Sequence, residues 1–480
     1  MRGAVAVSAG KGEVSVGRVA RGSRARTLLA SAAAVLALLA GAPARAETLE
    51  SALARAYDAN PTLNAQRAFQ RATDENVARA RAGQRPRVSA TADLQAQTSE
   101  IGGATPLQNG RSSSFPRGVG LTVQQNVFDG NRTRNSIRQA ESSVLGARQT
   151  LLDQEQTTLQ QAVEAYMNVL RDTATLNLQQ NNVEVLEEQL RQTRDRFNVG
   201  EVTRTDVAQA ESRVQGGLSA VARATAQLKA SIAVYRQIIG VAPGRLAPGR
   251  PYERDLPRSP EEGVRVALAQ HPAIRSALHS VDAALLAVKV TEGELAPTVA
   301  LQGSVSQRYD VLGVGDSRST ANLTAQLSVP IYEGGEVYAR VRQAKETLSQ
   351  RRLEADIVRE RVRANVIASF GSLEASRAQI VAAQAQVQAA EIALAGVREE
   401  AKVGQRTTLD VLNAQQEVLN ARVALVTAQR DRVVASYLLA QSLGRLTAAN
   451  LKLRVGLYDP VVHFDQVQDR WFGLRTPDGR

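Results

Sequence analysis

The 480-residue chain contains no cysteine, and aromatic residues make up only 4% of it. Without cysteine the chain can form no disulfide, use no catalytic thiol and carry no lipid on an N-terminal cysteine. Beside the scarce aromatics, Ala, Gln, Arg, Glu, Val and Leu dominate, which is typical of long helices that pack through small and aliphatic side chains. The composition therefore favours a mainly helical protein without thiol chemistry.

Motifs for catalysis are also missing. The sequence has no GxSxG, P-loop or helix-opening GxGxxG pattern. Of its three histidines, His271 stands before Pro272 at a helix break, and His279 and His463 lack nearby acidic residues at metal-ligand spacing. We therefore expect no enzymatic activity, no cofactor and no metal site.

Residues 1–46 have the pattern of a secretory signal sequence. Six basic residues precede an apolar run from Leu28 to Ala40, and Ala44-Arg45-Ala46 supplies small residues for cleavage before Glu47. The apolar run of about 13 residues is shorter than the ~20 residues that a membrane-spanning helix needs, so an anchor is the weaker interpretation. After this leader no apolar stretch approaches spanning length.

The leader also accounts for much of the positive charge. It holds seven Lys or Arg and one acidic residue, so its removal lowers the net charge from +12 to about +6. The remaining Arg and Glu residues are interspersed, and no basic block or aromatic-rich stretch suggests base stacking. We expect no nucleic-acid partner.

The rest of the chain contains an internal duplication. ESALARAYDANP at 50–61 corresponds to EEGVRVALAQHP at 261–272 with an offset of 211, and VFDG at 127–130 corresponds to IYEG at 331–334 with an offset of 204. The seven-residue difference falls between Pro86 and Phe128, where a loop would tolerate it. These offsets divide the chain into repeat 1, a Pro-rich linker, repeat 2 and a tail, at residues 47–240, 241–258, 259–444 and 445–480.

Each repeat contains two segments in which apolar residues alternate strictly with Ser, Thr, Gln and Asn. The segments are 88–96 and 119–127 in repeat 1, and 299–305 and 323–331 in repeat 2. Such alternation predicts strands with one apolar and one polar face, in β-hairpins at about 86–128 and 297–332.

The residues alone leave two interpretations of these hairpins open. They could be half-buried hairpins of a soluble protein, or strands of a membrane barrel with apolar faces toward lipid and polar faces toward a lumen. Phe128 and Tyr332 stand at matching strand ends, where interface aromatics would lie. Because four strands cannot close a barrel and lipid does not tolerate open edges, the membrane interpretation requires several chains.

Long helices fill the remainder of both repeats. About 70 residues without proline run from Gly130 to Val199, and residues 335–403 repeat the pattern, which corresponds to about 105 Å of continuous helix. Turns at about 199–203 and 403–407 reverse the chain, and helices of about 36 residues return to Gly240 and Gly444. The tail has no counterpart in the repeat, so we expect a loosely held extension.

In this order of elements the chain resembles the TolC family of outer-membrane efflux and secretion ducts. The resemblance covers essentially the whole mature chain and rests on the duplication, on VFDGNRTRNSIRQA with IYEGGEVYARVRQA, and on the paired Val-Gly turns. It implies a homotrimer in the outer membrane whose twelve strands form one β-barrel, continued by an α-helical barrel across the periplasm. It also implies a periplasmic adaptor and an inner-membrane RND or ABC pump as partners.

The two turns, FNVGEVTRTDV and AKVGQRTTLDV, carry the candidate site residues. Thr-x-x-Asp at each helix start is the pattern of a helix cap. The resemblance adds a gate, in which an aspartate of the first tip lies near an arginine of the second and neighbouring coils are tied together. The matching residues are Thr205, Asp206 and Arg406, and Asp410 matches an acidic ring that would favour cations. The expected adaptor-contacting tips are Val199, Gly200, Glu201, Val403, Gly404 and Gln405.

Two positions depart from the family pattern. Ala401 stands where a tyrosine clasp is expected, and Asn413 where a second acidic ring is expected. We therefore expect a less tightly held closed state. The leading hypothesis is a passive exit duct for efflux or type I secretion, and the alternative is a structural periplasmic coiled-coil or adaptor-like protein without a barrel.

Overall fold

The computed structural model describes residues 46–101, 110–253, 256–311 and 315–479. The chain divides into residues 1–46 and residues 47–480, and the account below concerns the second unit. The predicted signal sequence lies outside the described residues, apart from Ala46.

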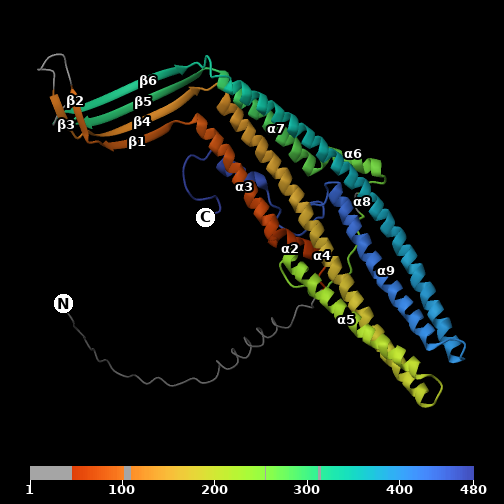
Figure 1. Cartoon of the computed structure of the whole chain (residues 1–480). Coiled ribbons are helices and arrows are strands. Elements are labelled where there is room, and N and C mark those ends of the chain that lie inside the picture. The colour runs from red at the N-terminus through yellow and green to blue at the C-terminus, as the bar shows by residue number, and fades with distance from the viewer. Residues whose placement is uncertain (1–45, 102–109, 254–255, 312–314, 480) are drawn as a thin grey trace, which may run out of the picture. The chain divides into compact units, whose positions relative to one another are not determined.

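Repeat 1 runs from two short helices through strands into two long helices. Its elements are α2 (Leu49–Ala59), α3 (Pro61–Arg81), β1 (Arg87–Leu94), β2 (Gln97–Ile101), β3 (Gly110–Ser114), β4 (Arg117–Phe128), α4 (Arg132–Asn198) and α5 (Arg204–Ile239). Repeat 2 follows the same order with α6 (Pro260–Gln270), α7 (Pro272–Glu292), β5 (Thr298–Tyr309), β6 (Ser317–Ser328), α8 (Glu336–Lys402) and α9 (Thr408–Ser442), and the tail adds α10 (Pro460–Val467). Figure 1 shows the sheet at one end of the long helices and the two tip turns at the other.

Each pair of short helices is divided by an X-Pro step. Asn60 and His271 both have extended backbones before a proline, which disfavours the helical conformation for the preceding residue. The side chain of Asn60 accepts hydrogen bonds from the N–H groups of Thr62 and Leu63, and Nδ1 of His271 accepts one from Ala273. The same residues that end α2 and α6 therefore cap α3 and α7.

The four long strands form one antiparallel sheet in the order β1-β4-β5-β6. Leu121 of β4 lies opposite Val305 of β5, and Gln124 lies opposite Gln302, so the two repeats join with apolar beside apolar and polar beside polar residues. The short β2-β3 pair extends the first hairpin into a region for which the sequence predicted only a loop. β2 and β3 lie in the interval between Pro86 and Phe128 in which repeat 1 is longer than repeat 2.

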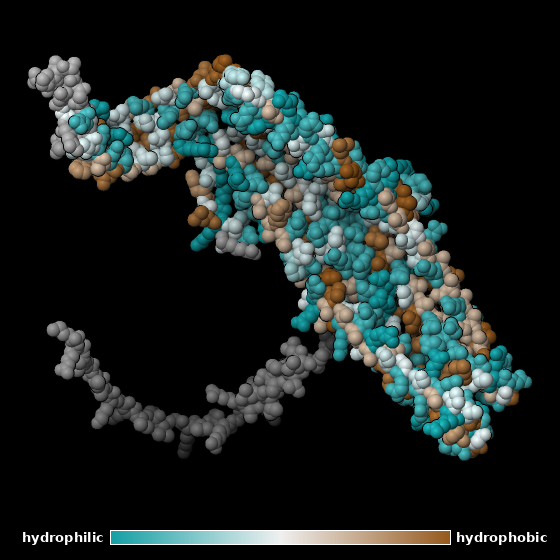
Figure 2. All heavy atoms as spheres, viewed as in Figure 1, coloured by the Kyte–Doolittle hydropathy of each residue, from teal (hydrophilic) through white to brown (hydrophobic). Residues whose placement is uncertain are grey.

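The apolar face of the sheet has no covering within the described chain. Leu94 is 79% exposed and Leu323 is 76% exposed, and Val88, Val119, Val305 and Leu327 are exposed as well. Figure 2 shows apolar and polar residues mixed over the strands rather than buried beneath a helix. A soluble half-buried hairpin would place one face against a core, so the uncovered face favours the membrane interpretation.

The sheet joins the helices through closely packed glycines. Gly130 has φ 66°, in the left-handed region, and a Cβ built there would lie 2.4 Å from the carbonyl oxygen of Gly293 in repeat 2. Its counterpart Gly334 has φ 64° and open space around it. Both turns need glycine for the backbone conformation, but only Gly130 also needs it for packing against the other repeat.

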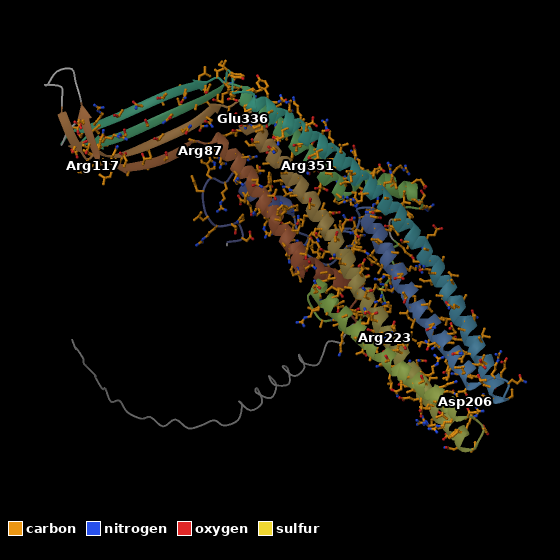
Figure 3. All side chains as sticks on the ribbon, viewed as in Figure 1. Arg87, Arg117, Asp206, Arg223, Glu336 and Arg351 are labelled. Atoms are coloured by element: carbon orange, nitrogen blue, oxygen red, sulfur yellow. The ribbon has the colours of Figure 1, made fainter. Side chains whose placement is uncertain are left out.

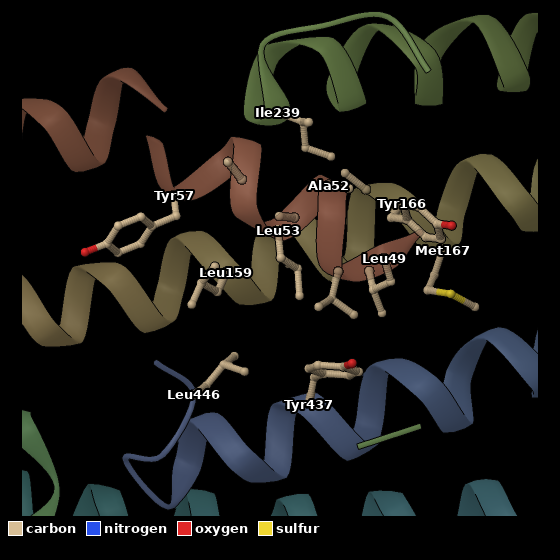
Figure 4. Close-up of a cluster of buried hydrophobic side chains, with 14 of the residues drawn as sticks. Leu49, Ala52, Leu53, Tyr57, Leu159, Tyr166, Met167, Ile239, Tyr437 and Leu446 are labelled. Atoms are coloured by element: carbon tan, nitrogen blue, oxygen red, sulfur yellow. The ribbon is translucent and has the colours of Figure 1, made fainter. Parts of the chain in front are cut away.

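The main hydrophobic core lies where α2, α4, α5, α9 and the tail meet (Figure 4). Leu53, Tyr166 and Leu446 are among its fully buried side chains. The hydroxyl of Tyr166 donates to the carbonyl oxygens of Glu47 and Ala247 at 2.8 and 2.6 Å, which ties the N-terminal segment to the linker. A second core, which includes Leu439 and Leu443, joins α6, α8 and α9.

The expectation of a loosely held tail is wrong. Leu446, Ala448 and Leu453 belong to the main core, and Glu155 accepts a hydrogen bond from the N–H of Ala448 at 2.7 Å. Farther along, Nδ1 of His463 on α10 lies 2.9 Å from the fully buried carboxylate of Asp74 on α3. These partners are distant in sequence, so no local pattern could have indicated them.

Helix α8 differs from the expectation that no apolar stretch after the signal sequence is long enough to span a membrane. Among the described helices, α8 alone is long and apolar enough by length and composition, with a mean hydropathy of 1.3 over its most apolar 18 residues. Such a single helix is weak evidence for a span. In the structure α8 forms an antiparallel hairpin with α9, and Glu391 of α8 pairs with Arg422 of α9 at 2.7 Å.

Candidate functional site

The candidate site comprises the two tip turns, where α4 reverses into α5 and α8 reverses into α9. Gly200 and Gly404 adopt φ 78° and 81°, the left-handed conformation that ends a helix most readily at glycine. The N–H of Glu201 donates to the carbonyl of Arg196, and the N–H of Gln405 donates to that of Glu400, each at 2.9 Å. The two turns therefore close their helices with the same geometry.

These turns expose one apolar side chain each. Val199 and Val403 are both 71% exposed, although valine is usually buried. Glu201 is held to Arg196 by an ion pair of 3.0 Å, whereas Gln405 carries no charge. The six predicted adaptor-contacting residues thus form two similar surfaces, each with an exposed valine and only the first with an acidic side chain.

Both returning helices begin with a complete capping box. The backbone N–H and the hydroxyl of Thr203 donate to Oδ2 of Asp206 at 2.9 and 2.7 Å, and Thr407 donates to Oδ2 of Asp410 at 2.9 and 2.8 Å. In return, the Thr hydroxyl oxygens accept from the N–H groups of Asp206 and Asp410. The cap interpretation of the Thr-x-x-Asp pattern is therefore right at both turns.

The caps keep both carboxylates charged. The hydroxyl of Thr203, followed by its backbone N–H, holds the pKa of Asp206 below its usual range. The backbone N–H of Thr407, followed by its hydroxyl, does the same for the pKa of Asp410. Thr205 lies exposed in the first turn of α5, outside this pair of hydrogen bonds.

Within one chain the arginine of the predicted gate has a different partner. Nε of Arg406 pairs with Glu400 at 2.8 Å, and this hydrogen bond is the main reason that the pKa of Arg406 is raised above its usual range. Asp206 is engaged by Thr203 on the other hairpin. Within the described part of one chain Arg406 thus pairs with Glu400, which the sequence did not single out, and no hydrogen bond or ion pair joins it to Asp206.

A second missed residue links the two helical hairpins directly. Nη2 of Arg213 on α5 donates to Oδ1 of Asn413 on α9 at 2.7 Å. Beneath this bond Leu186, Val214 and Leu412 form a small core of their own. Asn413 stands where the resemblance led us to expect a second acidic ring, and here its amide oxygen is an uncharged acceptor.

Two grooves run along the hairpins behind the tips. One, of about 430 Å³, is lined by residues of α4, α5 and α9 that include Gln179, Arg213 and Gln416. The other, of about 370 Å³, is lined by residues of α4, α8 and α9 that include Asn181, Arg398 and Arg422. Their linings are mixed, with amide and guanidinium groups beside aliphatic side chains.

Within the described ranges, the tips make helix caps and surface ion pairs. Among the described residues, no group of three or more His, Cys, Asp or Glu side chains is placed to hold a metal ion. His463 does have a carboxylate neighbour, Asp74, which α3 brings to it across 389 residues of chain.

Comparison with protein families gives one match over most of the chain. The model described as "Outer membrane efflux protein" matches residues 52–241 and 263–445, which covers both repeats. Among curated proteins, the chain is 43% identical to outer membrane efflux protein BepC of Brucella suis, over 94% of this chain and 97% of that protein. It is 26% identical to outer membrane protein TolC of Escherichia coli, over 85% and 84% of the two chains.

A third relative is named for secretion. The chain is 28% identical to the alkaline protease secretion protein AprF of Pseudomonas aeruginosa, over 69% of this chain and 70% of that protein. Solved structures share the fold at low identity. The Campylobacter jejuni CmeC outer membrane channel matches with a TM-score of 0.76 and 17% identity over 88% and 89% of the chains. The open state of the Neisseria gonorrhoeae MtrE channel matches with 0.69 and 20% over 83% and 89%.

Proposed function

The chain belongs to the outer membrane efflux protein family and is an outer-membrane channel that extends into the periplasm, and we propose that three copies form one duct that an adaptor connects to an inner-membrane pump. In this duct the strands of the three chains form a twelve-stranded barrel, and the long helices continue it as a periplasmic tunnel. A structural coiled-coil protein without a barrel is not favoured, because the family match covers the strands of both repeats.

The open edges of the sheet support closure by further copies. Within the described strands β1 and β6 are the edges, and each has one side without a hydrogen-bonded neighbour. An open edge cannot remain unpaired in lipid. Within the chain, β4, the last strand of repeat 1, pairs with β5, the first strand of repeat 2. By the same rule β6, the last strand of repeat 2, would pair with β1, the first strand of repeat 1 in the neighbouring chain.

The two faces of the sheet support a water-filled duct. The apolar face is exposed in the single chain, as a lipid-facing surface must be, and the opposite face carries Ser, Thr, Gln and Asn. Helices of 67 residues reach about 100 Å from the sheet. A passive conduit needs no catalytic group, and the tips are the farthest points from the strands (Figure 3).

We assign the gate to Thr205, Asp206, Arg406 and Asp410. In the described residues each capping threonine uses only Oδ2 of its aspartate, so Oδ1 of Asp206 can accept Arg406 of a neighbouring subunit while the cap stays intact. Arg406 is exposed, and the Glu400 contact that holds it is a surface ion pair that water screens and that contributes little to stability. Exchange of Arg406 between the two partners therefore costs little free energy.

Single-channel conductance of purified Arg406→Ala trimers in planar bilayers tests the gate. We expect a higher conductance than wild type, because the neighbouring coils lose a tie. Arg223→Ala removes the same charge from an exposed position on α5 and should leave the conductance unchanged. An Arg406→Ala conductance equal to that of wild type would remove Arg406 from the gate without affecting the channel assignment.

We assign the adaptor contact to the two tip surfaces that Val199, Gly200, Glu201, Val403, Gly404 and Gln405 form. Cysteines at Val199 and Val403 test it, since valine is exposed there and the left-handed glycines stay intact. Photocrosslinkers on these cysteines should capture a periplasmic protein that co-purifies with the pump. A cysteine at Leu353, exposed on α8 far from the tip, is the matched control.

The relatives favour efflux over protein secretion as the transport process. The protein with 43% identity is named an efflux protein, whereas the secretion relative has 28% identity over a smaller share of the chain. Deletion of the gene should raise sensitivity to small toxic compounds and leave the secreted proteome unchanged. The wild-type gene should restore resistance, whereas a variant that lacks the strands but retains Arg406 should not. Heat-modifiable, SDS-resistant trimers in outer-membrane fractions would accompany activity, and a monomeric periplasmic protein would overturn the proposal.

A further inference from the structure

The only tryptophan of the chain lies exposed in the tail. Trp471 follows α10 and is 59% exposed, and Phe472 beside it is 84% exposed. Their ring centroids are 6.3 Å apart, and Leu474 is fully exposed two residues later. In a chain with so few aromatic residues, three large apolar side chains within four positions that no described element covers need a physical reason.

The structure fixes this cluster at the helix-proximal end of the sheet. The guanidinium of Arg85 lies 4.6 Å above the Trp471 ring and donates to the carbonyl oxygen of Arg470 at 2.8 Å. Arg81 forms an ion pair with Asp469. Arg85 stands two residues before β1, so the tail is tied to the point where α3 passes into the first strand.

The level of the cluster can be followed across the sheet. The carbonyl of Gln84 accepts a hydrogen bond from Gln125 of β4 at 2.9 Å, and Gln125 precedes Phe128 by three residues. At about 3.3 Å per residue along a strand, Phe128 lies roughly 10 Å beyond Gln125, toward the end of β4 that leads into the helices. Phe128 and Trp471 therefore lie at the same end of the sheet, where the strands give way to helices. Tyr332 belongs to this end too, because it follows Ser328, the last residue of β6, which pairs with Thr298 at the start of β5.

The chemistry of the cluster matches a phospholipid interface. Tryptophan and its aromatic neighbours favour the headgroup region, where a ring is apolar and its N–H can reach water. Arg470 and Arg475 flank the cluster, and Arg85 makes its described hydrogen bonds to carbonyl oxygens rather than to a carboxylate. Apolar side chains beside cations bind an anionic headgroup surface through burial and charge together.

The buried contacts behind the cluster make it a rigid support rather than a free end. α10 is held on α3 by His463 and Asp74, and the ring of Phe464 lies 5.0 Å from the guanidinium of Arg148 on α4. The hydroxyl of Tyr458 donates to Gln70 of α3 at 2.9 Å. An apolar cluster on such a support can enter a membrane without first losing much conformational entropy.

We propose that Trp471, Phe472 and Leu474 insert into the headgroup region of the periplasmic leaflet of the outer membrane, so that the C-terminal tail anchors the duct at the base of its barrel. The anchor depends on the outer-membrane location of the chain and not on the gate or the adaptor contact.

Fluorescence of the full-length protein in vesicles tests this anchor, because Trp471 is the only tryptophan. The probe is a vesicle of phosphatidylethanolamine and phosphatidylglycerol, with or without bromine at the shallow acyl positions. We expect brominated lipid to quench the emission at least twofold, a blue shift relative to free tryptophan, and weak quenching by aqueous acrylamide.

A relocated tryptophan provides the matched control. Leu457 is 58% exposed in the same tail, next to Tyr458, which bonds to Gln70. Gln70 lies 11 residues before Arg81 on α3, or about 16 Å farther from the sheet. In the Trp471→Phe, Leu457→Trp double variant we expect no quenching by brominated lipid and strong quenching by acrylamide.

Two outcomes would overturn the proposal. Quenching by acrylamide but not by brominated lipid would place Trp471 in water. A blue-shifted emission that neither agent quenches would mean that a protein surface, such as a second copy of the chain, covers the cluster. Both outcomes leave the channel assignment intact, because trimer formation and conductance are measured on the same vesicles.

Discussion

Arg213 and Asn413 join the two helical hairpins close to their tips, through a 2.7 Å hydrogen bond from a guanidinium on α5 to an amide oxygen on α9. The bond lies over the small core of Leu186, Val214 and Leu412. Because a charged donor meets a neutral acceptor, the link is stronger than an ordinary hydrogen bond but lacks the strength of an ion pair. Together with this core, it holds the two hairpins of one subunit to each other near their tips.

Removal of this link should let the two tips move independently. In Arg213→Ala we expect a broader distance distribution between spin labels on cysteines at Val199 and Val403, measured by pulsed electron spin resonance in trimers with one labelled subunit. Asn413→Asp should narrow the distribution, because it turns the bond into an ion pair. Arg223→Ala, ten residues along the same helix, is the control and should leave the distribution as in wild type.

The register between subunits follows from the register within the chain. Leu121 lies opposite Val305; adding the offset of 204 to position 121 and subtracting the offset of 211 from position 305 predicts that Ala325 lies opposite Leu94 of the next subunit. Since the chain has no native cysteine, the Ala325→Cys, Leu94→Cys variant should form a disulfide-linked trimer on non-reducing gels. Ala325→Cys with Asp93→Cys places the thiols on opposite faces of the sheet. Crosslinking of that control pair, and not of the first, would show a different register.

The buried Asp74 should make the tail sensitive to pH once its partner is removed. Burial raises the pKa of Asp74, and the hydrogen bond and charge of His463 oppose this rise. For a carboxylate with a raised folded-state pKa, the associated stability is present below the ordinary pKa and is lost as pH rises through the raised value. In His463→Leu, which leaves a buried acceptor without its donor at a cost of about 2 kcal/mol, proteases should release the tail faster at pH 8 than at pH 5.

A second substitution separates charge from packing at this site. In the double variant His463→Leu, Asp74→Asn, the side chain at position 74 cannot ionise, while Gln70 remains next to it. We expect tail release in this variant to be the same at both pH values. Faster release at pH 5 than at pH 8 in the single variant would contradict the assigned sign.

The capping boxes predict a pH threshold at the tips. The pKa values of Asp206 and Asp410 are lowered by their threonines, so cap stability is fully present above the ordinary value of 3.8 and is lost as pH falls through the lowered values. Hydrogen exchange at the starts of α5 and α9 should therefore have equal protection at pH 5 and pH 7. Thr407→Ala removes a cap of about 1 kcal/mol and should speed exchange about fivefold at α9. Thr408→Ala, one residue later, should have a much smaller effect.

Much of the fold could be predicted because its information is local and repeated. Period-2 alternation identified the four long strands, and the absence of proline over about 70 residues indicated α4 and α8, whose bounds lie within a few residues of the expected ends. The break at Asn60-Pro61 also has a local cause, and its counterpart at His271-Pro272 repeats it. β2 and β3 were missed because their residues have no apolar alternation.

The parts that escaped prediction depend on contacts between distant residues. His463 and Asp74 are 389 residues apart, and the tail has no copy in which the same pairing could be seen. At the candidate site, the caps of Asp206 and Asp410 could be predicted from the four-residue pattern Thr-x-x-Asp, whereas the partner of Asn413 could not, because Arg213 lies on another hairpin. Glu400 is close to Arg406 in sequence, but the turn geometry decides whether they meet.

The unequal surroundings of Gly130 and Gly334 also determine where the curvature of the duct originates. In a trimer the six repeats divide a circle into steps of about 60°, and each chain already contains one complete step, with Gly130 seated against Gly293. Gly334 has the same left-handed conformation, but no described atom lies within 4 Å of a Cβ built there. A bulky residue at either position therefore strains the left-handed backbone, but only one at position 130 also obstructs the packing of the two repeats within one chain.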